Sequence, residues 1–360
     1  AVNMIASFSS RGPRGFDSFL KPDVTAPGGS IFAADMGSGD GGVSKGGTSM
    51  AAPHVAGLAA LMVEAAAGRS EAVSIPQMTK AAMMNTATDL TEGMQIPRQG
   101  AGRVNAVEAV SAVDAAGGVN TLAFADPTLV TANWGVVPTS NDQKVMTTTI
   151  TVWSDYPGTL TYTVSADLAV NAMISDTKMT ITDTTMITDA VMVDVAPTQV
   201  VLDASGGAVV DTVVLTLTVD ATKFPADFWW LEEVYGYVDM MPTDTMANEM
   251  RVPFYALPRP YTKFTDIETN TSMANPAIGE VTAVLTQTGP ISSSLRAYPA
   301  LVYDANEAGQ MDHGDIRMMG AKYDPFFQTL DIAINSYGHW HTPQPYIAEF
   351  DLYLDVDEDG

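Results

Sequence analysis

The residue with the clearest chemical potential in this sequence is a serine at the start of an apolar run. Ser49 follows Gly46 and Gly47 in the segment GGTSMAAPHVAGLAALMVEA, and residues 49–63 carry no formal charge unless His54 is protonated. The pattern predicts an apolar helix that begins near Ser49, where free N–H groups and the positive end of the helix dipole stabilise negative charge. The two glycines would let a substrate backbone approach closely. A serine at such a position is most often an N-cap; the chemical alternative is a nucleophile, which needs a base and oxyanion donors.

The complete string favours the nucleophile. GTSMAAPHVAG resembles the nucleophile motif of the subtilisin-like serine proteases (subtilases), and SFSSRGP, KPDVTAPG and GAGRVNAVEAV resemble other segments of that family in the family's order. The resemblance covers residues 1 to about 118. It implies a serine endopeptidase that cleaves polypeptide substrates through an acyl-enzyme, with Ser49 as the nucleophile and its own N–H as one oxyanion donor. The G-x-S-x-G elbow of the α/β-hydrolases is disfavoured because Ala51 follows Met50.

The resemblance gives structural roles to other residues of these motifs. Asp23 matches a non-catalytic position of the family, and Arg11 and Gly12 match a turn. His54 matches a histidine on a buried helix, and it stands five residues past Ser49, about one and a half helical turns away. We therefore expect His54 to point into the core and not to serve as the base.

Two members of the catalytic triad that the resemblance implies have no match in this chain. Neither a D-[ST]-G turn nor an H-G-T-H helix start occurs, and Asn3 is too close to SFSS to match the family's oxyanion asparagine. We expect the chain to be a fragment that lacks the N-terminal half of the catalytic domain, including the triad Asp and His, and that is inactive by itself. The alternative is a non-catalytic cell-surface adhesion or scaffolding module with a degenerate protease domain.

Composition and charge limit the classes of partner. The 360-residue chain has 46% hydrophobic residues, no cysteine and a formal net charge of −25. Residues 1–118 contain ten acidic and eight basic side chains, whereas residues 119–360 contain 32 and nine, so the acidity is concentrated in the second part. A strongly anionic surface repels nucleic acids and anionic lipids. Thiol catalysis is excluded, and the apolar run around Leu58 is shorter than the roughly 20 residues that span a bilayer.

Periodicity predicts a multidomain chain in which the fold class changes near residue 118. Residues 1–118 are expected to form an α/β, subtilisin-like domain with an incomplete parallel sheet that includes MIASFSS, and with a short buried strand at SIFAA. Two further helices are predicted from capping signals, one starting after Ser74 with Gln77 at the matching offset, the other starting after Asn105.

The rest of the chain is predicted to be all-β. Residues 119–261 alternate apolar and threonine side chains in TLTYTV and VVLTLTV, which indicates an antiparallel β-sandwich that ends in an edge strand, RVPFYALPRP. Residues 262–360 predict a further β-rich domain, truncated at its end, with strands at GEVTAVLTQ, PALVYD, TLDIAINS and IAEFDLYLDV. WGVVP and the segment from EVYGYVDMM to ALPRP resemble the fibronectin-III-like module of larger secreted or cell-surface subtilases, which implies an extracellular location.

No cofactor is required for the implied chemistry, but the C-terminus suggests a metal. Asp355, Asp357 and Asp359 alternate before Gly360, as at the opening of a calcium loop; a structural Ca²⁺ site and a solvated acidic tail both remain open. For the remaining candidates, a surface or packing role is favoured over a metal or ligand site: His313, His339, His341, Trp229 and Trp230.

Overall fold

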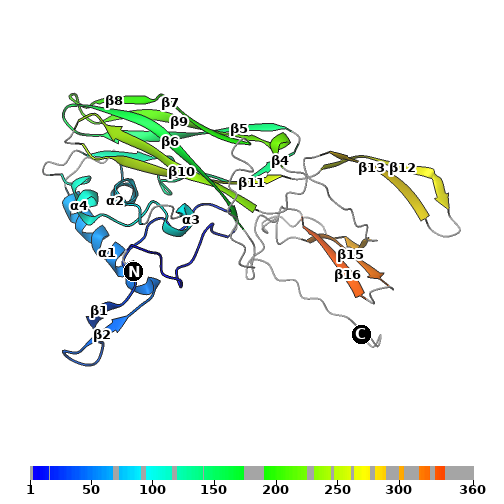
Figure 1. Cartoon of the computed structure of the whole chain (residues 1–360), viewed down its shortest axis with the longest axis horizontal. Coiled ribbons are helices and arrows are strands. Elements are labelled where there is room, and N and C mark those ends of the chain that lie inside the picture. Colours follow the sequence, from blue (N-terminus) through cyan, green and yellow to red (C-terminus); the bar gives the residue numbers. More distant parts are fainter. Residues whose placement is uncertain are drawn as a thin grey trace. The chain divides into compact units, whose positions relative to one another are not determined.

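The computed structural model, drawn in Figure 1, describes most of the chain up to residue 336. The described residues are 3–15, 17–67, 73–90, 95–115, 120–140, 142–173, 190–224, 231–244, 247–260, 263–275, 280–288, 300–303, 316–324 and 329–336. The chain divides into two units, Ala1–Pro13 with Phe19–Ser292 and Arg14–Ser18 with Ser293–Gly360, and each is described by itself.

Capping side chains set the starts of two helices, as predicted. The helices are α1 (Thr48–Ala65), α2 (Ile75–Asn85), α3 (Ile96–Gln99) and α4 (Ala106–Ser111), with a 3-10 turn, η1 (Ala221–Lys223). The Ser74 N–H donates to Gln77 Oε1 at 3.2 Å, and Asn105 Oδ1 accepts from the Glu108 N–H at 3.4 Å. These bonds satisfy donors that have no partner inside the helix. Within the described segments, no helix is long and apolar enough to cross a membrane.

The strands of the first 118 residues differ from the prediction. Described strands here are β1 (Ile31–Ala34) and β2 (Gly42–Lys45), which form an antiparallel hairpin, and a single parallel bridge joins Thr25 to Arg103. The predicted strand MIASFSS is wrong, because residues 4–10 pair with no described strand and a strand needs a hydrogen-bonded neighbour. The expected burial of β1 is also wrong: three of its four residues are exposed. No multi-stranded parallel sheet is present in the described part of residues 1–118.

Two larger sheets lie in the first unit. Their strand orders are β4-β11-β10-β6-β8 and β3-β5-β9-β7, and all neighbours are antiparallel except the parallel pair β4 and β11. The bounds are β3 (Thr121–Phe124), β4 (Ala132–Thr139), β5 (Gln143–Ser154), β6 (Thr159–Met173), β7 (Val191–Ala196), β8 (Gln199–Asp203), β9 (Val209–Asp220), β10 (Leu231–Pro242) and β11 (Met250–Pro260).

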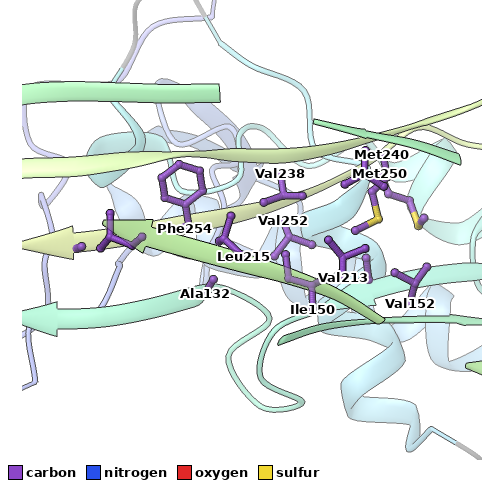
Figure 2. Close-up of a cluster of buried hydrophobic side chains, with 14 of the residues drawn as sticks. Ala132, Ile150, Val152, Val213, Leu215, Val238, Met240, Met250, Val252 and Phe254 are labelled. Carbon is purple, nitrogen blue, oxygen red and sulfur yellow. The ribbon is translucent and has the colours of Figure 1, made fainter. Parts of the chain in front are cut away.

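The two sheets share one hydrophobic core. The predicted alternation is confirmed in β9, where the inward side chains are fully buried: Val213, Leu215, Leu217 and Val219. In β6, Leu160, Tyr162 and Val164 are buried in the same cluster. Figure 2 shows labelled side chains from strands of both sheets meeting in this core, among them Leu215 of β9 and Phe254 of β11.

Strand β11 lies inside its sheet, so the prediction that RVPFYALPRP forms an edge is wrong. Its neighbours are β4 and β10, with Pro253 opposite Tyr237 and Pro258 opposite Val137. Each proline forfeits at most one ladder hydrogen bond. Burial outweighs that loss, because nearly every side chain from Val252 to Leu257 is removed from water.

The remaining strands pair with neighbours that are close in sequence. In the first unit β12 (Lys263–Asn275) pairs with β13 (Glu280–Thr288); in the second, β14 (Ala300–Tyr303), β15 (Ile316–Asp324) and β16 (Thr329–Ser336) form an antiparallel sheet. Strands predicted at GEVTAVLTQ, PALVYD and TLDIAINS are therefore confirmed. IAEFDLYLDV lies outside the described residues.

The helices pack against the four-stranded sheet through a second core cluster. Leu58 and Met62 of α1 belong to the same cluster as Leu122 of β3 and Trp153 of β5. At the end of α2 the Asn85 amide group is buried, with Nδ2 donating to the carbonyl oxygens of Ala123 and Arg251 at 2.9 Å each and Oδ1 accepting from the Ala123 N–H at 2.9 Å. This amide ties α2 to β3 and to β11 of the other sheet.

A buried carboxylate makes another link between the N-terminal segment and the sheets. Glu233 of β10 is fully buried; it pairs with Arg11 and accepts a hydrogen bond from Tyr255 Oη at 2.9 Å. Arg11 also donates to Gln95, which agrees with the structural role expected for it. Burial raises the pKa of Glu233 in spite of the Arg11 charge, because Arg11 is itself one-third exposed and its field is partly screened by water.

Replacing Glu233 with glutamine is expected to remove a pH-dependent loss of stability. A carboxyl whose pKa is raised by folding binds its proton more tightly in the folded chain, so stability falls as pH rises above the unfolded value of about 4.3. The free energy of unfolding of Glu233→Gln, relative to the unmodified chain, should therefore increase between about pH 4 and pH 7. Urea unfolding across this range measures it, with the exposed Glu64→Gln as control. If the stability of Glu233→Gln relative to the unmodified chain instead decreased with pH, the Arg11 charge would outweigh burial in setting the pKa of Glu233.

Candidate active site

Ser49 is the second residue of α1, not its N-cap. The N-cap is Gly47, with φ 156° and ψ 161°, and no side chain caps the helix. This backbone region is essentially restricted to glycine. The N-cap interpretation of Ser49 is thus excluded by where the helix begins, and the glycine immediately ahead of Thr48 is required by the backbone.

The loop before Ser49 is fastened to the KPDVTAPG segment. The Gly47 N–H donates to the carbonyl oxygen of Gly28 at 2.8 Å. A Cβ at Gly28 would lie 2.9 Å from the Gly47 carbonyl oxygen and 3.4 Å from Ala51 Cβ, so only glycine allows this approach. Two segments that the sequence analysis singled out separately therefore meet at the entrance of α1.

Ser49 combines an exposed side chain with a backbone N–H that has no acceptor among the described residues. The first-turn N–H of Met50 donates to the Gly47 carbonyl oxygen at 3.0 Å, whereas no described residue accepts from the Ser49 N–H. The Ser49 residue is exposed. A free N–H at a helix N-terminus, at the positive end of the helix dipole, suits an anionic oxygen.

His54 is exposed, so the expectation that it is buried is wrong. Its Nδ1 lies 2.8 Å from the Met50 carbonyl oxygen, one turn back along α1. Five residues of helix separate Ser49 and His54 by about 7.5 Å along the axis and about 140° around it. The described side chains cover only the face of α1 that carries Leu58 and Met62, which explains the exposure of His54. This geometry is not that of a serine–histidine pair.

The uncovered face of α1 is apolar. Leu61 is 56% and Val63 46% exposed, and Ala52, Ala56 and Ala60 are exposed on the same helix. A helix that is apolar all round normally lies inside a core. In the described part of the chain, α1 therefore carries an exposed apolar patch.

Asp23 has a structural environment, as expected. Its carboxylate pairs with Lys21 Nζ at 2.6 Å and with Lys80 Nζ at 3.3 Å. Its carbonyl oxygen accepts from the Ala101 N–H at 2.9 Å, which joins KPDVTAPG to GAGRVNAVEAV. The Asp23 carboxylate is thus paired with lysine side chains, which supports a structural role and not the role of a triad acid.

A cleft of about 730 Å³ lies elsewhere in the first unit and does not include Ser49. Its lining residues are 85–89, 105, 108, 165, 239, 241 and 247–251. Asp239 is among them; burial raises its pKa although the Arg251 charge opposes the shift. Sequence periodicity gave no sign of this cleft, because its walls come from α2, β6, β10 and β11.

The other candidate residues lie outside the described residues: Trp229, Trp230, His313, His339, His341, Asp355, Asp357 and Asp359. Within the described segments, no group of three or more histidine, aspartate or glutamate side chains could hold a metal ion. The calcium site at the C-terminus stays a prediction.

Known proteins resemble the N-terminal part of the chain. Residues 1–102 match the family model described as the subtilase family, Peptidase_S8. The minor extracellular protease Vpr of Bacillus subtilis is 40% identical over 116 residues, which are 30% of this chain and 14% of that protein. The subtilisin-like protease SBT2.5 of Arabidopsis thaliana is 36% identical over 146 residues, which are 35% of this chain and 17% of that protein. The matches thus span less than a fifth of the length of these relatives.

Solved structures resemble the chain only weakly. The CooA pilin subunit of enterotoxigenic Escherichia coli aligns with a TM-score of 0.26 and 15% identity, covering 39% of this chain and 96% of the pilin. A PapD-like domain of human CEP192 aligns with a TM-score of 0.25 and 10% identity, covering 39% of this chain and 86% of that domain. These scores are too low to assign the sheets to either fold.

The family match therefore rests on the segment that contains the Ser49 loop and the loops fastened to it. Residues 1–102 of the chain are similar to the subtilase family over the part that its model matches.

Proposed function

We propose that the protein is a serine endopeptidase in which Ser49 is the acyl-forming nucleophile. The observation that carries the proposal is the start of α1, where an exposed serine with an unbonded N–H follows a glycine N-cap. Nucleophile and oxyanion donor are thus parts of one residue, held at the positive end of a helix. The similarity of residues 1–102 to the subtilase family model supports the same assignment.

The reaction would proceed by acyl transfer. Ser49 Oγ bonds to the carbonyl carbon of the scissile peptide while its proton passes to a base, and the carbonyl oxygen becomes an oxyanion that accepts from the Ser49 N–H. Collapse of this intermediate breaks the C–N bond, and the base returns the proton to the leaving amine. Water then repeats the sequence on the acyl-enzyme and releases Ser49. No cofactor takes part.

We assign the base and its orienting carboxylate to segments of a longer protein. His54 faces away from Ser49, as described above, and no second histidine lies in residues 1–118. The same missing half of the catalytic domain would cover the apolar face of α1 around Leu61 and Val63. Polypeptides are the proposed substrates.

We also propose an extracellular protein with a fibronectin-III-like module in residues 119–261. The relatives include one named an extracellular protease and one named a secreted protease. The shared core of the two large sheets supports the two-layer module. A structural Ca²⁺ would bind near Asp355, Asp357 and Asp359.

Replacing Ser49 with alanine in the longer protein is expected to abolish peptide hydrolysis. Removal of a triad nucleophile costs about 10⁴–10⁶ in kcat, leaving only the rate due to binding and oxyanion stabilisation. Peptide turnover under saturating substrate measures the effect. The exposed Ser44→Ala on β2 is the matched control, which should keep full activity. Normal proteolysis by Ser49→Ala would reject the assignment.

Residues 1–360 alone are expected to be inert toward peptides and toward a fluorophosphonate probe. An unassisted serine hydroxyl stays protonated near neutral pH, so it attacks neither reagent at a useful rate. The apolar face of α1 should also make this chain associate at high concentration. Mass spectrometry after probe incubation tests the first point. Stoichiometric labelling of Ser49 would reveal a base within this chain.

Calcium is expected to bind the longer protein near its three alternating aspartates. Calorimetric titration with Ca²⁺ should give heat in the unmodified protein and none in a variant with Asp355→Asn and Asp357→Asn, because carboxylates are the ligands that Ca²⁺ prefers. Equal heats from both proteins would place any calcium elsewhere.

A further inference from the structure

The side chain of Tyr237, on β10, reaches from the five-stranded sheet to Gly100 and Asp89 in the N-terminal part of the chain. Its hydroxyl donates to the Gly100 carbonyl oxygen at 3.0 Å and lies 3.3 Å from Asp89 Oδ1. The Tyr237 residue is 9% exposed, and the Arg251 guanidinium carbon stands 4.3 Å from the ring centroid. Burial raises the pKa of Tyr237 far above its ordinary value, so the hydroxyl remains a donor at any working pH. Tyr237 is therefore a fixed donor to Gly100.

Asp89 offers the Tyr237 hydroxyl a second acceptor, at 3.3 Å, beside the nearer Gly100 carbonyl oxygen at 3.0 Å. Asp89 is itself held in place: its Oδ2 is 2.8 Å from Arg251 Nη1, and its Oδ1 accepts from Gln99 Nε2 at 3.3 Å. Arg251, from β11, therefore holds both the tyrosine ring and Asp89.

Gly100 is packed tightly against the segment that contains Asp23. Its φ is 66°, and a Cβ there would lie 2.3 Å from the Asp23 carbonyl oxygen. The following N–H, of Ala101, donates to that same carbonyl at 2.9 Å. The contact is backbone against backbone, with no flexible side chain between, so the position of Gly100 fixes the position of the Asp23 peptide.

Two more hydrogen bonds extend this contact along the KPDVTAPG segment. The Thr25 N–H donates to the Gly102 carbonyl oxygen at 2.8 Å, and the Val104 N–H donates to the Thr25 carbonyl oxygen at 2.9 Å. Residues 100–104 and residues 23–25 therefore run side by side as a short parallel pair.

The KPDVTAPG segment also contacts the N-cap of α1. Three residues after Thr25, the Gly28 carbonyl oxygen accepts from the Gly47 N–H, and Gly47 precedes Thr48 and Ser49. Pro27 fixes one of the few backbone torsions in between. The path from the sheet to the nucleophile is thus short and consists of backbone contacts.

We propose that Tyr237 is a positioning residue for Ser49: by holding Gly100, it sets where the N-terminus of α1 presents the nucleophile. The inference rests on the proposed function and adds to it a role for the β-sheets in the acylation step. Tyr237 touches neither Ser49 nor a reacting atom, so it acts only through residues 100–104, 23–28 and 47. Positioning matters here because a misplacement of about 1 Å can cost about 100-fold in rate.

The test is Tyr237→Phe in the longer, active protein. This change keeps the ring and its stacking with Arg251 and removes only the donor. We expect kcat and the rate constant for fluorophosphonate labelling of Ser49 to fall about tenfold, with KM within about twofold, because alignment and not substrate binding is lost. Both rates are measured well below the melting temperature of each variant. They are expressed per active site, with the concentration of active sites determined by titration. The matched control is Tyr162→Phe, a fully buried tyrosine in the core of the same sheet, which should leave both rates unchanged.

The outcomes separate this inference from the proposed function. If Tyr237→Phe kept the wild-type rates per active site, the inference would be overturned, whether or not the melting temperature fell. The hydroxyl would then be a stabilising contact only. An equal loss in Tyr162→Phe would also overturn it, since any disturbance of the sheet would then suffice. Turnover that survives Ser49→Ala would instead reject the proposed function.

Discussion

The buried amide of Asn85 is the contact on which the arrangement of helices and sheets depends. Its three hydrogen bonds satisfy backbone groups of β3 and β11. Each such group left buried without a partner would cost about 1–3 kcal/mol, so the end of α2 is held at one place on the two sheets. With α2 fixed, α1 and α4 complete a core that includes Leu122 and Trp153. The helices have no separate core of their own in the described structure; they close against strands that follow them in sequence.

Polar contacts between residues 1–102 and the sheets link the two parts in the same way, but with charged groups. Glu233 forms an ion pair with Arg11 and accepts a hydrogen bond from the Tyr255 hydroxyl, and Arg251 forms an ion pair with Asp89. Removing charges from water is expensive, so such pairs contribute less to stability than their Coulomb energy suggests. They do restrict geometry, because a partner displaced by a few ångströms would leave a buried charge unpaired. The sheets therefore constrain the chain at Arg11 and at Asp89 more strongly than apolar packing alone would.

Features encoded within a few residues could be predicted from the sequence. The caps of α2 and α4, the alternation in β9 and the start of α1 near Ser49 each follow from local sequence patterns. Features set by distant partners could not. The central place of β11 depends on β4, more than 100 residues earlier, and prolines 253 and 258 pointed to an edge. His54 was expected to be buried because it matches a histidine on a buried helix of the subtilases, but burial depends on what covers a helix and not on the helix sequence alone.

The same distinction applies to the candidate site. The free N–H and the hydroxyl of Ser49 belong to one residue in the first turn of α1, so a local motif of eleven residues can point to them. In the proposed reaction the base would come from another segment, and its distance from Ser49 would depend on how that segment and α1 are both held. Tyr237 stands 137 residues from Gly100, and no local sequence pattern around either residue predicts their contact. Under the proposed function, coverage of the apolar face of α1, supply of the base and fixation of the Ser49 loop are therefore three separate requirements for acyl transfer. The described sheets would contribute to the third through Tyr237.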